Sequence, residues 1–89
     1  MLKKLKYMPY AQAKVYQDNT MTALISYQTD VLYITDHWLR CTGLYSMTTR
    51  RHISAFLKEY LPNVSFQTIK TLASTGFQLN LLTGEVAGF

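Results

Sequence analysis

Residues 45–57 read Tyr-Ser-Met-Thr-Thr-Arg-Arg-His-Ile-Ser-Ala-Phe-Leu, and they carry the strongest structural signal in the chain. It predicts the end of a strand, a capped turn and the start of an amphipathic helix. Five apolar residues recur at the spacing of one helical face, which is typical of a helix packed on a core: Ile53, Phe56, Leu57, Tyr60 and Leu61. Thr48 or Thr49 can supply the N-cap oxygen and Pro62 stops the helix, so one main helix is expected over about residues 50–61.

The expected first turn of this helix is unusually basic, because Arg50, Arg51 and His52 follow one another there. The positive end of the helix dipole disfavours each cation by roughly a few tenths of a kcal/mol. Backbone N–H groups at a helix start also bind anions, and the two threonines ahead of the arginines would add hydroxyl donors. The alternative is a solvated charged face on which one arginine pairs with a carboxylate. The candidate residues for contact with a partner or an anion are Thr48, Thr49, Arg50, Arg51, His52 and Lys58, with Trp38 as an apolar anchor.

Residues 22–45, upstream of the helix, predict a β-meander. The segments rich in residues that favour strands are residues 22–27, 31–35 and 38–42. A turn or a bulge separates the first two at residues 28–30. Asp36-His37 has the length of a two-residue hairpin loop, although it lacks the favoured glycine. A further short strand is expected at residues 14–17.

A second, shorter helix is expected over about residues 66–73. Ser65 can cap it and Gly76 suits its C-terminal end, although a strand over residues 64–69 is the competing interpretation. Residues 77–81 alternate strictly and predict a strand that joins the sheet. The expected fold class is therefore α+β, with a small, mostly antiparallel sheet of about three to five strands packed against the main helix and the second short helix.

The bulk composition indicates one small domain that spans residues 1–89. Hydrophobic residues make up 48% of the 89 residues and charged residues 16%, which suits a thin single core rather than a disordered chain. Apolar residues in the segment 1–12 follow neither helical nor strand spacing, so the segment forms either a flexible arm or an edge strand. The seven tyrosines leave room for a homo-oligomer or a partner-covered surface. The net charge of +4 favours acidic partners such as nucleic acid or a nucleoprotein complex.

The cytoplasm is the expected compartment. The single cysteine, Cys41, cannot form an internal disulfide, so a reducing environment is the default. No apolar run approaches the roughly 18 residues of a membrane span, and no hydrophobic signal-peptide core follows the N-terminal lysines. We therefore expect no membrane contact.

The usual constellations of catalytic and metal-binding residues are missing from the sequence. His37 and Cys41 lie four residues apart on an expected strand, roughly 13 Å from each other by strand rise, so they cannot chelate one ion together. The five carboxylates are scattered, without a pair suited to acid–base work, and there is no glycine-rich phosphate loop. We therefore expect a non-enzymatic protein with no cofactor and no metal.

An aromatic sheet face is the second candidate surface. Tyr27, Tyr33 and Trp38 fall on expected strands, and aromatic platforms stack the bases of single-stranded nucleic acid. The alternative is that these rings lie on the face that the helices bury.

Two segments of the chain resemble a family of small, uncharacterised bacteriophage proteins. The matching residues are Ser26-Tyr27-x-Thr29-x-Val31 and Tyr45-Ser46-x-Thr48-Thr49-x-Arg51-His52-Ile53-x-x-Phe56-Leu57. The family signature is Tyr-Ser-x-Thr-Thr-x-(Arg/Lys)-His-(Ile/Gln), and in that family it follows a short β-hairpin and opens a helix. The resemblance covers roughly residues 22–61.

This resemblance implies a non-enzymatic phage accessory protein that binds a host protein or nucleoprotein complex in the host cytoplasm. Such proteins inhibit defence systems such as CRISPR–Cas, in the manner of anti-CRISPR proteins, or modulate transcription and replication. A small nucleic-acid-binding regulator of phage transcription or replication is the alternative function, and a self-assembling structural protein is a third.

Overall fold

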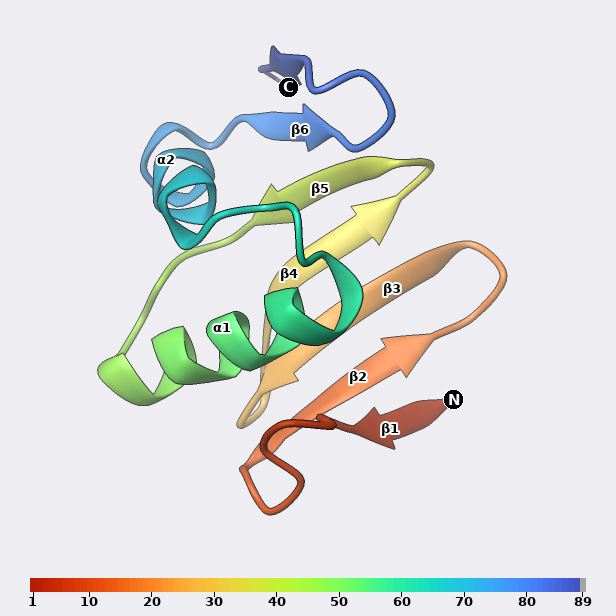
Figure 1. Cartoon of the computed structure of the whole chain (residues 1–89), viewed down its shortest axis with the longest axis vertical. Coiled ribbons are helices and arrows are strands. Elements are labelled where there is room, and N and C mark those ends of the chain that lie inside the picture. The colour runs from red at the N-terminus through yellow and green to blue at the C-terminus, as the bar shows by residue number, and fades with distance from the viewer. Residues whose placement is uncertain (89) are drawn as a thin grey trace.

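The computed structural model describes residues 1–88, in which one antiparallel sheet carries two helices on one of its faces (Figure 1). Within this part of the chain, seven strands lie side by side in chain order. They are β1 (Leu2–Lys4), β2 (Ala13–Gln17), β3 (Met21–Ser26), β4 (Thr29–Thr35), β5 (Trp38–Cys41), β6 (Gln78–Asn80) and β7 (Val86–Ala87). The helices α1 (Met47–Tyr60) and α2 (Phe66–Thr75) come between β5 and β6. The predicted α+β class and both helices are confirmed, and the sheet has more strands than expected.

The predicted two-residue hairpin loop at Asp36-His37 joins β4 to β5. Thr35 and Trp38 pair directly across it. Both loop residues have positive φ, 48° and 69°, as a type I′ turn requires. Because neither is glycine, each occupies a left-handed conformation that costs an L-residue roughly 1–2 kcal/mol.

The connection between β3 and β4 contains both a turn and a bulge. Tyr27-Gln28 forms the turn, and a shift in register then leaves Val31 as an extra residue on β4. Val31 is fully buried, so the bulge directs one more apolar side chain into the core. Both alternatives expected near residues 28–30 therefore occur, one after the other.

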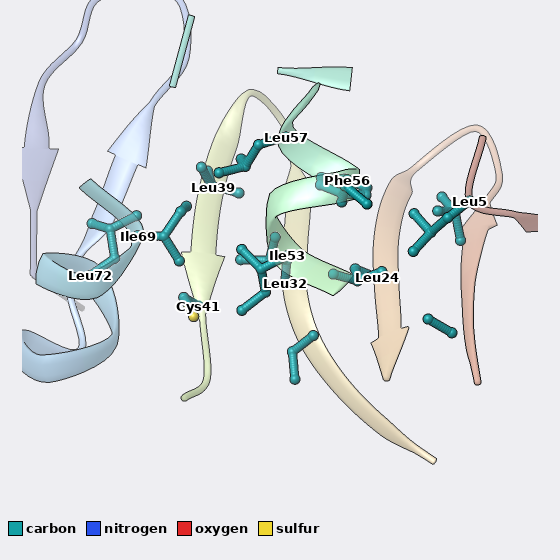
Figure 2. Packing of buried hydrophobic residues seen from close by; sticks show 14 residues of the cluster. Leu5, Leu24, Leu32, Leu39, Cys41, Ile53, Phe56, Leu57, Ile69 and Leu72 are labelled. Atoms are coloured by element: carbon teal, nitrogen blue, oxygen red, sulfur yellow. The ribbon is translucent and has the colours of Figure 1, made fainter. Parts of the chain in front are cut away.

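The core lies between the helices and one face of the sheet (Figure 2). Its floor consists of leucines from three neighbouring strands, Leu24, Leu32 and Leu39, which are fully buried. Ile53 and Phe56 of α1 pack onto this floor (Figure 2), as the predicted apolar stripe requires.

The second helix, α2, covers the β5 side of the same face. Ile69 and Leu72 are its fully buried residues, and Cys41 on β5 is buried beneath them (Figure 2). Burial raises the pKa of the Cys41 thiol, so this cysteine acts as a small apolar core residue rather than as a nucleophile.

The predicted ends of α2 are confirmed. Ser65 Oγ accepts a hydrogen bond of 3.2 Å from the Thr68 N–H, and Gly76 ends the helix with a φ of 74°. The competing interpretation of residues 64–69 as a strand is wrong, because this cap fixes the segment as a helix start.

The start of α1 differs from the prediction. Ser46 is the N-cap: it has extended backbone, and its Oγ accepts a 3.2 Å hydrogen bond from the Thr49 N–H. The prediction of Thr48 or Thr49 as the cap is therefore wrong, because both threonines already belong to the helix. The three consecutive basic residues fall beyond the first three helical positions. The dipole penalty inferred from the sequence largely disappears there, since it fades within the first turn.

Part of the N-terminal segment forms an edge strand, which is one of the two alternatives expected for residues 1–12. β1 pairs with β2, and Leu5, directly after it, is fully buried in the core. The Lys6 N–H donates a 2.8 Å hydrogen bond to Oε1 of Glu59 on α1. The pairing with β2, the buried Leu5 side chain and the hydrogen bond to α1 thus hold a segment in which apolar residues show no regular spacing.

Candidate functional site

The start of α1 is joined to β3 by buried hydroxyls and one imidazole. Ser26 Oγ lies 3.0 Å from Thr49 Oγ1 and 2.8 Å from His52 Nδ1. These three side chains are at most 3% exposed, and their mutual hydrogen bonds satisfy polar groups that would otherwise destabilise the interior. Thr49 Oγ1 also accepts a 3.3 Å hydrogen bond from the Ser46 hydroxyl. We call Ser26, Ser46, Thr49 and His52 the hydroxyl–histidine network.

One direction of donation satisfies every hydroxyl in this network. The Ser46 hydroxyl donates to Thr49 Oγ1. The Thr49 hydroxyl can then donate to Ser26 Oγ, and the Ser26 hydroxyl can donate to Nδ1 of His52. The imidazole is then neutral, with its proton on Nε2. Burial lowers the pKa of His52 and so favours the same neutral form. The Tyr27 ring packs against the imidazole with a centroid separation of 5.8 Å.

A serine beside a histidine is also the minimal pair for nucleophilic catalysis. Here the Ser26 side chain is 2% exposed, and its oxygen is already engaged by Thr49 and His52. A substrate has no access to it in this conformation. The network therefore gives a structural reason for Ser26, Thr49 and His52 at these positions of the chain.

The structure separates the predicted contact residues into three groups. Thr49 and His52 are inside the protein and do not reach the surface. Thr48 is exposed near the start of α1, where the N–H of Thr49 is already used by the cap. Arg50, Arg51 and Lys58 lie on the outward side of α1, and Trp38 lies on the other face of the sheet.

The three outward cations line two adjoining depressions along α1. The first, of about 460 Å³, is lined by Met8, Met47, Arg50, Arg51, Ser54 and Phe66. The second, of about 310 Å³, is lined by Ser54, Leu57, Lys58, Pro62, Val64 and Phe66. Since they share Ser54 and Phe66, we treat them as one surface, the basic groove. Among these described lining residues there is no carboxylate, so the groove combines an apolar floor with positive charge.

The walls of the basic groove come from distant parts of the chain. Met8 belongs to the connection between β1 and β2, and Phe66 begins α2. At the far end, Lys58 Nζ lies 4.3 Å from the centroid of the Tyr7 ring, a cation–π contact. The N-terminal segment therefore completes a surface that α1 alone does not form.

The aromatic face predicted from the sequence is present in part. Tyr33 and Trp38 lie on the sheet face opposite to the helices, because their strand neighbours Leu32 and Leu39 point into the core. Tyr27 is not on that face, since it lies in the turn and packs against His52.

Several residues of these surfaces were missed by the sequence analysis. Ser46 carried a recognisable signal, a serine three residues before Thr49, whose N–H it caps. Ser26 carried none, because a serine on an alternating strand reads as solvent-facing. Met8 and Phe66 enter the basic groove only through tertiary packing.

The fold and surfaces define a small α+β protein whose helix-side groove is basic and whose buried polar network fixes the start of α1. The family model DUF8033, a family of unknown function, matches residues 3–71, which is more than half of the chain. The chain belongs to this family. Comparisons with curated proteins and with solved structures found no match.

No helix within residues 1–88 is long and apolar enough to cross a membrane. The same part of the chain contains no group of three or more His, Cys, Asp or Glu side chains that could hold a metal ion.

Proposed function

We propose that this protein is a non-enzymatic binding protein that captures an acidic, amphipathic segment of a partner protein in the basic groove. The observation that carries the proposal is the convergence of Arg50, Arg51 and Lys58 on an apolar depression whose described lining contains no carboxylate. Isolated surface cations are solvated and contribute little to binding. Cations that flank apolar area can pair with carboxylates while the apolar side chains of the same segment are buried.

The residue types in the groove suit this role. Arg and Met are enriched in protein interfaces, and the flexible thioether of Met adapts to irregular partner surfaces. Met47 is 66% exposed, so part of its apolar surface is available for burial by a partner. The described groove volumes of about 460 and 310 Å³ are in the range that accommodates apolar side chains.

The biological setting of this proposal rests on the resemblance to phage proteins. A phage accessory protein in the host cytoplasm would use the groove to occupy a surface on a host protein or nucleoprotein complex. A component of a defence system such as CRISPR–Cas is one candidate partner of this kind.

The proposal is tested with fluorescein-labelled peptides in an anisotropy titration. The probe is a helical peptide with glutamates on one face and leucines on the other, and the reference is polyglutamate of the same length. We expect the amphipathic peptide to bind more tightly. We expect the double variant Arg50→Ala/Arg51→Ala to weaken its binding about tenfold, since two flanking charges are removed.

Lys70→Ala is the matched control, because Lys70 is an exposed cation on α2 outside the groove. It should leave peptide binding unchanged. If Lys70→Ala weakens binding as much as the double arginine variant, or if polyglutamate binds as tightly as the amphipathic peptide, the interaction reflects net charge alone and the groove proposal fails.

A further inference from the structure

The sheet face opposite to the helices carries a group of aromatic and basic side chains that is separate from the basic groove. Both helices lie over one face of the sheet, and the other face is left without a helix (Figure 1). Strand register places three aromatic and three basic side chains on this open face. They are Tyr16, Tyr33, Trp38, Lys4, Lys14 and Arg40, which we call the aromatic face.

The rings on this face are close together across the strands. Tyr16 and Tyr33 both pair with Ala23, one from each side, so their Cα atoms are roughly 10 Å apart at ordinary strand spacing. Ala23 is only 2% exposed although no helix covers its face, which shows that the side chains around it shield it. Trp38 lies two residues from Arg40, the partner of Tyr33 on β5, and such diagonal neighbours are within reach of aromatic side chains.

The two tyrosine rings are held in place by carboxylates near the rim of the face. The Tyr16 hydroxyl donates a 2.6 Å hydrogen bond to Asp18, and the Tyr33 hydroxyl donates a 3.4 Å hydrogen bond to Asp30. The hydrogen bond to Asp18, followed by its charge, raises the pKa of Tyr16. Burial, followed by the charge of Asp30, raises the pKa of Tyr33. Both rings therefore remain uncharged, and an incoming planar group meets surfaces that are already oriented.

The three cations of the face outnumber the two carboxylates that hold the tyrosine rings, Asp18 and Asp30, and this balance favours an anionic occupant. Lys4 and Lys14 are direct cross-strand partners, an arrangement of like charges that destabilises a sheet. An alternative explanation for Lys4 is that lysines on an edge strand discourage sheet-to-sheet aggregation. This explanation does not apply to Arg40, because β5 lies well inside the sheet. Arg40 is close enough to Tyr33 for its charge to affect the pKa of that phenol. Aromatic surface and positive charge are thus interleaved.

We propose that the aromatic face binds single-stranded nucleic acid, with bases stacked on Tyr33, Trp38 and Tyr16 and phosphates near the three cations. Stacking on aromatic rings combined with a basic track is the general chemistry of such sites. A second copy of this chain fits the face less well, because face-to-face association would bring the cations of both copies together. Duplex DNA also fits less well, since its bases are stacked inside and are read by elements that enter a groove.

The protein supplies its own reporter for this interaction, because Trp38 is its single tryptophan. Titration with an oligothymidylate of about 12 nucleotides, a length within the range of small single-strand sites, should quench tryptophan emission. A labelled form of the same oligonucleotide gives affinity by anisotropy. Binding should weaken steeply between about 50 and 200 mM salt, and a duplex of the same length should bind less tightly.

Paired variants separate stacking from loss of fold. Tyr33→Ala and Trp38→Ala should each weaken oligonucleotide binding by about 5- to 100-fold. Tyr33→Phe and Trp38→Phe retain a ring and should stay within a few-fold of the unmodified protein. Lys14→Ala should weaken binding and reduce its dependence on salt.

The double variant Arg50→Ala/Arg51→Ala distinguishes this proposal from the groove proposal, because it should leave oligonucleotide binding unchanged. The proposal is overturned if the oligonucleotide does not bind at about 50 mM salt, or if loss of the groove arginines weakens binding while loss of the rings does not. Light scattering that shows a dimer disrupted by Trp38→Ala would also overturn it, in favour of a second copy as the occupant.

Discussion

Ser26 Oγ lies 2.8 Å from Nδ1 of His52 and joins β3 to α1 across 26 residues of chain. Both side chains are almost completely buried. Because the Ser26 oxygen also contacts Thr49 Oγ1 at 3.0 Å, one hydroxyl positions two residues of the helix. The start of α1 is therefore set by a polar contact with the sheet as well as by its apolar stripe. This orients the outward arginines of the basic groove.

Removal of one member of the hydroxyl–histidine network should destabilise the fold. Ser26→Ala leaves the buried Nδ1 of His52 without its partner, and a buried unsatisfied polar atom costs about 1–3 kcal/mol. Thr49→Val should show a smaller loss of about 1 kcal/mol, since it keeps the side-chain shape. Chemical denaturation measures the free energy of unfolding of both variants. Thr48→Val, at the exposed neighbouring position, should change the free energy of unfolding by less than about 0.5 kcal/mol. An equal loss for Thr48→Val and Thr49→Val would contradict this role of the network.

The same network predicts a dependence of stability on pH. Burial lowers the pKa of His52 from its ordinary value of 6.5, so the unfolded chain binds this proton more tightly than the folded protein. The contribution of His52 is therefore fully present above about pH 6.5 and is lost as the pH falls below that value. For one proton, the free energy of unfolding cannot change by more than about 1.4 kcal/mol per pH unit. Urea midpoints between about pH 7.5 and 5.5 measure it, in a window above the titration of ordinary carboxylates.

A matched pair of histidine variants identifies the group responsible. His52→Gln should lower stability at neutral pH and flatten the dependence on pH in this window. His37→Ala should retain the slope of the unmodified protein, because His37 lies exposed in the hairpin loop. If His37→Ala flattens the profile and His52→Gln does not, the assignment to the buried imidazole is wrong.

The hairpin loop itself offers a stabilising substitution. His37 has a φ of 69°, and Asp-Gly is a preferred pair for a type I′ turn. His37→Gly should raise the free energy of unfolding by about 1 kcal/mol, because glycine occupies this conformation without steric cost. His37→Ala keeps the Cβ atom and should give no such gain. If thermal unfolding shows a similar gain in stability for His37→Ala, the cost lies in the histidine side chain and not in the backbone conformation.

The elements that the sequence predicted well carry their own local signals. α1 repeats apolar residues at helical spacing, and α2 has a serine at one end and a left-handed glycine at the other. The hairpin at Asp36-His37 has two flanking strands of favourable composition. β1 and β7 have three and two residues, which is too short for any period to show. They exist because β2 and β6 offer pairing edges, and such partners are visible only in three dimensions.

The candidate site was predictable only for its exposed members. Arg51 and Lys58 share a helix face by spacing alone, and the structure places them beside the same groove. The burial of His52 depends on Ser26, far away in the sequence. Because the N-cap is Ser46 and not Thr48 or Thr49, the basic residues lie farther from the positive end of the helix dipole than the sequence indicated. This removes the electrostatic reason for an anion site at the helix start. Local pattern therefore identified the right segment, but long-range contacts decided which of its side chains face a partner.

The edge strand at the N-terminus leads to the last prediction. Leu5 is fully buried in the core, whereas Leu2, three residues earlier, is 56% exposed. Leu5→Ala should therefore cost about 2–5 kcal/mol, the usual range for a large-to-small substitution in a core. Leu2→Ala, with the same change in chemistry, should cost less than about 0.5 kcal/mol. Since the connection after β1 carries Met8 and Tyr7 to the groove, Leu5→Ala should also weaken binding of the amphipathic peptide. Equal unfolding midpoints for the two variants in chemical denaturation would show that residues 1–12 behave as an arm in solution, and the groove would then have to be formed by the two helices alone.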